Sequence, residues 1–118
     1  MKIRGCFVSD LHLLSSRSVG ARLWQDFRGE LLRCNLLVLG GDIFDFRWSR
    51  HEELSHSLSE VSNWLDALLK HYPQLRVAYV LGNHDCLLSS RVQASTSFFG
   101  FALTCTTMEQ TSLFAFYR

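Results

Sequence analysis

The chain has 118 residues, enough for one small domain with a single hydrophobic core. Its hydrophobic content of 47% and charged content of 19% are those of a globular protein and argue against disorder. The net charge of +1 provides no strong field that would favour nucleic acid or a membrane surface as partner. No stretch approaches the roughly 20 continuous apolar residues of a membrane span.

The cysteines and the N-terminus bear on the cellular compartment. Cys6, Cys34, Cys86 and Cys105 are widely spaced and form no Cys-x-x-Cys pair, so the sequence gives no support for a zinc ribbon. Residues 1–9 are too short and too polar for a signal peptide. We therefore expect free thiols and a cytoplasmic location.

Apolar runs and helical periodicity predict alternating strands and helices. In chain order, we expect a short buried strand at 3–9, a helix at 21–33, a buried strand at 36–39, a helix at 54–70 and a strand at 75–81. The second helix has the clearest apolar repeat and is followed by Pro73, a common stop signal. The first helix is expected to carry one apolar stripe, formed by Leu23, Trp24, Phe27, Leu31 and Leu32.

The order of these elements predicts an α/β fold with a parallel sheet and right-handed crossovers. Farther on, residues 95–104 fit either a strand or a buried turn of helix, and residues 113–117 fit a strand. In open α/β sheets ligands bind at the carboxyl ends of the strands. Polar motifs follow each of the first three expected strands, so we expect them to converge at that edge.

The first motif is Asp10-Leu11-His12. In an extended segment, residues two positions apart point the same way, so one carboxylate and one imidazole could reach a single cation. A surface polar pair is the ordinary alternative for so short a motif.

The second motif begins at the tight turn Gly40-Gly41, where glycines allow the backbone to approach a ligand closely. Asp42 then stands where a carboxylate could bridge two cations. Asp45 could orient a ligand or accept a hydrogen bond from one. A turn with a helix-capping aspartate is the alternative.

The third motif is Gly82-Asn83-His84-Asp85. Asn83 offers a neutral oxygen ligand, and His84 could protonate a leaving group or stabilise charge on a phosphoryl oxygen. Asp85 could hold the imidazole in the required tautomer. Each motif alone could be a polar turn, but three in succession after strands favour a joint metal site.

This ligand set suits Mn, Fe or Zn better than metals that prefer thiolates. Two such ions about 3.5–4 Å apart clamp a phosphoryl group and activate a water molecule. We find neither a nucleophilic Ser or Cys constellation nor a Gly-x-x-x-x-Gly-Lys phosphate loop, which argues against a kinase or an NTPase.

Taken together, the motifs resemble the signature of the calcineurin-like metallophosphoesterase superfamily over about residues 2–85. The resemblance implies the N-terminal half of a metallophosphoesterase α/β sandwich. It also implies metal-dependent hydrolysis of phosphomonoester, phosphodiester or diphosphate bonds, with metal-bound hydroxide as nucleophile. By this resemblance Asp10 and His12 bind the first of two divalent ions, Asp42 bridges both, Asn83 binds the second, and His84 is catalytic. From the motifs themselves we add Asp85 and Asp45 as catalytic candidates that support His84, and we favour Mn over Fe or Zn as the metal.

One feature departs from this family. The family carries a Gly-His-x-His motif downstream, whereas this sequence has no histidine after His84. We expect His51, His56 and His71, on or beside the second helix, to have structural roles. Residues 1–118 are therefore expected to form a single domain truncated at its C-terminus. Besides the enzyme, two interpretations stay open: a noncatalytic remnant or binding protein, and a site completed by another chain.

The segment from Ile43 to Trp48 is most similar to bacterial enzymes related to UDP-diacylglucosamine diphosphatase. The side chains that follow this motif could contact a substrate phosphate or stack on a base; they are Arg47, Trp48 and Arg50. The alternative is that this segment is the solvated start of a helix, with Trp48 packed on the protein core. Arg91 is a weaker candidate of the same kind. We expect a phosphate-ester small molecule or a nucleotide-type substrate. A nuclease of the superfamily is the alternative enzyme, although no clear basic track for nucleic acid is visible. Peripheral membrane contact and oligomeric state stay open.

Overall fold

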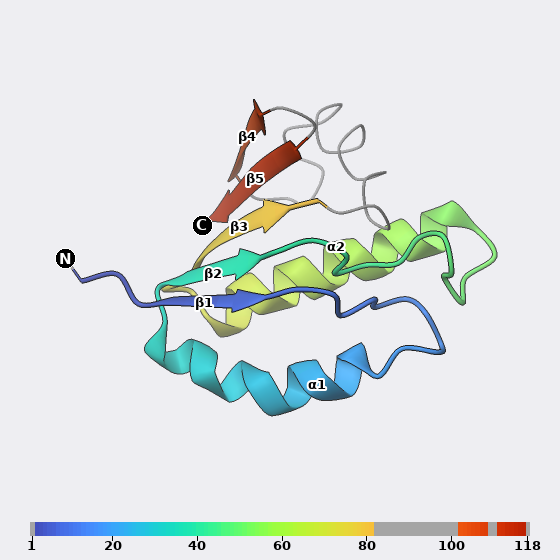
Figure 1. The fold of residues 1–118 in the computed structure, drawn as a ribbon, viewed down its shortest axis with the longest axis horizontal. Helices are drawn as coiled ribbons and strands as arrows, with labels where there is room; N and C mark the ends of the chain where they lie inside the picture. Colours follow the sequence, from blue (N-terminus) through green and yellow to red (C-terminus); the bar gives the residue numbers. More distant parts are fainter. Residues whose placement is uncertain (1, 82–101, 109–110, 118) are drawn as a thin grey trace.

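A computed structural model describes residues 2–81, 102–108 and 111–117, which form a five-stranded sheet with helices packed against it (Figure 1). The strands are β1 (Gly5–Val8), β2 (Leu36–Leu39), β3 (Arg76–Val80), β4 (Ala102–Met108) and β5 (Thr111–Tyr117). The helices are α1 (Gly20–Phe27), its 3₁₀ continuation η1 (Arg28–Arg33) and α2 (Leu54–His71). The bounds of β2 and α2 agree with the prediction to within one residue.

The strands lie in the order β1-β2-β3-β5-β4. The first three are parallel, and they confirm the predicted α/β class. β5 pairs antiparallel with β3, and β4 pairs antiparallel with β5, so the sheet as a whole is mixed. Residues 102–104, left open between strand and helix, belong to a strand, while residues 95–101 lie outside the described residues.

Both helices pack on the same face of the parallel strands. Because β2 lies beside β1 and β3 beside β2 in one direction, two crossovers of the same hand bring α1 and α2 to one side. The ring of Trp24 in α1 lies 4.8 Å from that of Trp64 in α2, and Trp64 meets Phe44 edge-on. Phe44 in turn lies 6.3 Å from Tyr79 of β3. Since Phe44 belongs to the second polar motif, this aromatic row anchors that motif to the core.

β1 is less buried than predicted and shorter, because it forms one edge of the sheet. Only Cys6 and Val8 face the core, since helices cover one face of the strand. On the other face Phe7 is 65% exposed. Its ring lies over Gly40, where a Cβ atom would come within 2.2 Å of it.

The single apolar stripe predicted for the first helix is also wrong. Trp24 and Leu31 are buried, whereas Leu23 and Leu32 are exposed. Leu23 precedes Trp24 by one residue on α1, about 100° around the helix, and so lies off its buried side, while at Arg28 the α-helix gives way to a 3₁₀-helix of three residues per turn. A stripe drawn at 3.6 residues per turn therefore loses its register along η1.

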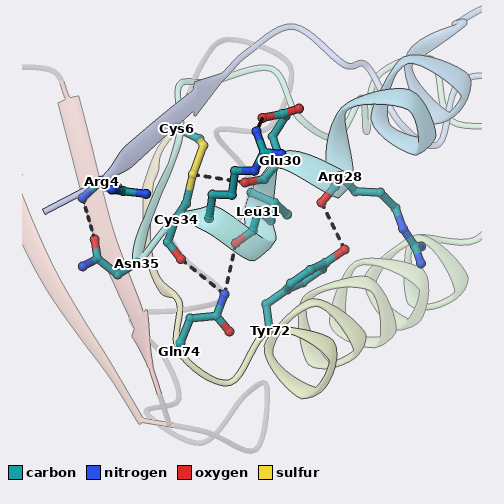
Figure 2. The surroundings of a disulfide bond; sticks show 10 residues. Arg4, Cys6, Arg28, Glu30, Leu31, Cys34, Asn35, Tyr72 and Gln74 are labelled. Carbon is teal, nitrogen blue, oxygen red and sulfur yellow. Dashed lines mark hydrogen bonds and ion pairs between the residues drawn. A yellow bond between two sulfur atoms is a disulfide. The ribbon is translucent and has the colours of Figure 1, made fainter.

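A disulfide joins Cys6 of β1 to Cys34, which caps η1 (Figure 2). Their Cα atoms are 6.6 Å apart, and the sequence separation is 28 residues. The expectation of free thiols is thus wrong for these two residues, because the pairing of β1 with β2 brings them together. These two cysteines therefore give no support for a reducing compartment.

Residues that follow α2 donate hydrogen bonds to backbone carbonyls of η1 and of its C-cap, Cys34 (Figure 2). The side-chain amide of Gln74 donates to the carbonyls of Leu31 and Cys34 at 3.0 and 3.2 Å. The hydroxyl of Tyr72 donates to the carbonyl of Arg28 at 3.1 Å. The two bonds from Gln74 satisfy carbonyls at the carboxyl end of η1, and the bond from Tyr72 ties the end of α2 to the first residue of η1. Within the described residues, no helix has the length and apolar character needed to cross a membrane.

Gly20 provides a test of how α1 meets the loop that follows β1. A Cβ at this position would lie 1.7 Å from the carbonyl oxygen of Leu11, between the two polar residues of the first motif. We predict that Gly20→Ala lowers the free energy of unfolding by about 2 kcal/mol, measured by urea denaturation. The control is Gly29→Ala, whose Cβ meets nothing within 4 Å and which should leave stability unchanged or raise it by up to about 1 kcal/mol. Equal stabilities of the two variants would contradict this packing.

The disulfide gives a second prediction. A cross-link that closes a loop of 28 residues should stabilise the fold by about 3 kcal/mol, because it restricts the unfolded chain. Replacing Cys6 and Cys34 together by serine should therefore lower the urea midpoint. A reductant should lower the midpoint of the wild type and leave that of the double variant unchanged. A wild type that is insensitive to reductant, with no Cys6–Cys34 peptide in unreduced digests, would disprove the bond.

Candidate metal centre

The loops that follow β1 and β2 run side by side at the carboxyl ends of these strands. The backbone N–H groups of Asp10 and His12 donate to the carbonyls of Gly41 and Asp42, each at 2.9 Å. The N–H of Asp45 returns a bond to the carbonyl of Leu13 at 2.7 Å. The parallel pairing of the two strands therefore continues past their ends, and it brings the first two polar motifs together.

The backbone of these loops is left-handed at the polar residues. Asp10, His12 and Asp42 have φ angles of 57°, 47° and 52°, and Leu14 has 82°. These are all the non-glycine residues with positive φ in the described part of the chain. The prediction from an extended segment is therefore wrong in its geometry, although the two side chains do meet. Aspartate and histidine tolerate this conformation better than most residues, and such strain clusters at functional sites.

Ligand atoms of Asp10, His12 and Asp42 lie within 4.8 Å of one another. Nε2 of His12 is 3.8 Å from Oδ1 of Asp10. Two atoms bound to one cation at about 2.0–2.2 Å lie at most about 4.4 Å apart, so a small closure suffices to hold an ion. Asp10 is exposed and the other two are partly exposed, which leaves the group accessible from solvent. Two carboxylates and an imidazole fit a divalent ion such as Mn, Fe or Zn.

Asp45 lies beneath this group and is only 4% exposed. Its Oδ2 lies 3.1 Å from Nδ1 of His12, and its Oδ1 accepts the backbone N–H of Trp48 at 3.0 Å. Because a carboxylate only accepts, Nδ1 carries the proton, and Nε2 is the nitrogen presented toward Asp10. A carboxylate that fixes the tautomer and direction of an imidazole in this way is typical of metal sites.

The residues predicted from the third motif, Asn83, His84 and Asp85, lie outside the described residues, as does Arg91. Their roles stay predictions.

The arginines after the second motif have different surroundings. Arg50 forms an ion pair with Glu60 of α2 and donates its backbone N–H to Leu14. It thus holds its loop against α2. Arg47 lies over the indole of Trp48, with 5.8 Å between the guanidinium carbon and the ring centroid. Trp48 is 57% exposed, so the alternative in which it packs on the core is wrong.

Among residues 2–81, the histidines other than His12 lie outside this metal group. Nε2 of His51 is 3.0 Å from Glu60, and that of His56 is 3.9 Å from Glu53. His71 is the last residue of α2.

The structure also shows a residue that the sequence analysis missed. Arg17 lines a pocket next to His12 and Asp45, together with Trp48. The signal that could have found it is the polar run Ser15-Ser16-Arg17-Ser18, which begins three residues after His12 and precedes a helix.

Comparison with known proteins bears on the family. The sequence model of the calcineurin-like phosphoesterase family matches residues 3–116. No curated protein and no solved structure matches the chain. The family match covers almost the whole sequence, including the paired loops with Asp10, His12 and Asp42. The chain therefore belongs to the calcineurin-like phosphoesterase family.

Proposed function

We propose that this protein is a metal-dependent hydrolase that cleaves phosphomonoester, phosphodiester or diphosphate bonds with the aid of two divalent ions. The observation that carries the proposal is the group formed by Asp10, His12 and Asp42 at the carboxyl ends of two parallel strands. Family membership points to the same chemistry.

In this proposal Asp10 and His12 hold the first ion, and Asp42 bridges to a second ion that Asn83 helps to bind. Support comes from the mutual distances of the first three residues and from the carboxylate that directs His12. Manganese is the first choice for a set of carboxylate, imidazole and amide ligands, with iron or zinc as alternatives. Bound ions of this kind neutralise phosphoryl oxygens and lower the pKa of a water molecule.

The remaining catalytic roles rest on the sequence motif. We assign His84 to protonate the leaving group and Asp85 to orient its imidazole. Asp45, buried and bonded to His12, acts through that ligand and is a positioning residue.

The substrate in this proposal is a phosphate-ester small molecule or a nucleotide-type compound. The near-neutral charge offers little attraction for a nucleic-acid backbone, so a nuclease is the less favoured enzyme. The likeness of residues 43–48 to UDP-diacylglucosamine diphosphatases and the cytoplasmic location stay predictions from the sequence.

Metal titration followed by thermal melting tests the proposal. Mn²⁺ at 100 times its Kd should raise the free energy of unfolding by about 2.7 kcal/mol. We predict that Asp42→Asn abolishes this rise and any hydrolysis of bis(4-nitrophenyl) phosphate. Asparagine removes the charge but tolerates the left-handed backbone at this position, so the fold should persist.

The matched control is Asp26→Asn, an exposed carboxylate on α1, which should respond to Mn²⁺ as the wild type does. Metal binding without hydrolysis would support the noncatalytic interpretation. Absence of any Mn²⁺ effect on the wild type would overturn the proposal.

A further inference from the structure

An open pocket of about 440 Å³ lies against the candidate metal group. His12 and Asp45 form one side of it, and Trp48 and the turn before α1 form the rest. Its volume falls within the range of about 300–1,000 Å³ typical of small-molecule sites. A substrate whose phosphate lies at His12 would place its next chemical group in this pocket.

Trp48 presents an aromatic surface to this pocket from a fixed position. Tryptophan side chains are usually highly buried, whereas this one is 57% exposed. Its backbone N–H binds Oδ1 of Asp45, whose other oxygen binds His12, so one buried carboxylate positions both the candidate metal ligand and the backbone of Trp48. The guanidinium of Arg47 lies over the ring and restricts it further. Stacking of a planar ring on the indole would offset the cost of this exposure.

Arg17 supplies the positive charge of the pocket. Its turn is fixed, since its N–H donates to Oγ of Ser15 at 3.3 Å, and the hydroxyl of Ser18 donates to the carbonyl of Leu11. The Arg17 side chain is exposed and has no carboxylate partner among the described residues, in contrast to Arg50, which binds Glu60. An exposed guanidinium beside a phosphate site is well suited to bind a second phosphate group.

The charged side chains that line the pocket favour a ligand that carries a phosphate group. Asp45 is buried and bonded to His12, so Arg17 is the exposed charge among the lining residues. The hydroxyls of Ser15 and Ser18 and the exposed side chain of Val19 complete a wall that is partly polar and partly apolar. A sugar attached to a base would meet both kinds of surface.

We propose that this pocket binds a nucleoside diphosphate, with its base stacked on Trp48 and one phosphate contacting Arg17. The orientation of the other phosphate toward the metal group rests on the proposed function. The contacts with Trp48 and Arg17 do not depend on a metal, so they are measurable without one.

The experiment is a set of metal-free titrations with ADP, adenosine and pyrophosphate. Binding is measured by calorimetry and by tryptophan fluorescence. Trp24 and Trp64 lie in or against the core, so quenching at the exposed Trp48 reports base stacking. ADP should bind more tightly than pyrophosphate. Trp48→Ala should weaken ADP binding about 5- to 100-fold and leave pyrophosphate binding unchanged. Trp48→Phe keeps an aromatic ring and should retain most of the affinity for ADP.

Arg17→Gln should weaken the binding of ADP and of pyrophosphate about 10-fold and leave that of adenosine unchanged. Its control is Arg22→Gln, an exposed arginine on α1 outside the pocket, which should bind all three ligands as the wild type does. Equal affinity of the wild type for ADP and pyrophosphate, or ADP binding unaffected by Trp48→Ala, would overturn the proposal.

A separate Mn²⁺ titration of the same proteins distinguishes this inference from the proposed function. If the wild type binds Mn²⁺ but binds ADP no more tightly than pyrophosphate, the nucleotide pocket is refuted and the proposed hydrolase function is not. If the wild type binds ADP through Trp48 but does not bind Mn²⁺, the proposed hydrolase function is refuted and the nucleotide pocket is not.

Discussion

The geometry of the site depends on one buried carboxylate. Asp45 accepts a hydrogen bond from the ring of His12 and another from the backbone of Trp48, so it joins the loops that follow β1 and β2. A carboxylate that is 4% exposed must be fully hydrogen-bonded to be stable there, and each bond it makes positions a residue at the surface above it. Asp45 thus connects the imidazole of His12, a candidate metal ligand, to the backbone of Trp48 beside the neighbouring pocket.

A second constraint is the left-handed backbone at Asp10, His12 and Asp42. Each such residue costs of order 1–3 kcal/mol, so the surrounding structure must hold the loops firmly. The backbone bonds that extend the β1–β2 pairing do this, together with the close approach of Gly20 to Leu11. In return the two loops direct the three candidate metal ligands to one point from short turns, where an extended chain would have spread them along a strand.

The sequence predicts the alternation of strands and helices because period and run length are local properties, and β2 and α2 agree to within a residue. It also places the first two motifs correctly, since both follow a strand. Features that depend on contacts distant in the chain could not be found in this way. The bond between Cys6 and Cys34 requires the pairing of two strands, and the exposure of Phe7 requires knowing that the helices cover only the opposite face of β1. The place of Arg17 beside the site depends on a turn geometry that composition alone does not give.

The most direct test of this account is the affinity for Mn²⁺ after Asp45→Asn, measured by calorimetry. The amide oxygen can still accept the N–H of Trp48, but the amide nitrogen would donate to Nδ1 of His12 and shift the imidazole proton to Nε2, the nitrogen that should bind the metal. We therefore predict a 10- to 100-fold loss of Mn²⁺ affinity with little change in the melting temperature of the metal-free protein. Wild-type affinity in this variant would show that Asp45 does not control the metal ligand, and would contradict the account.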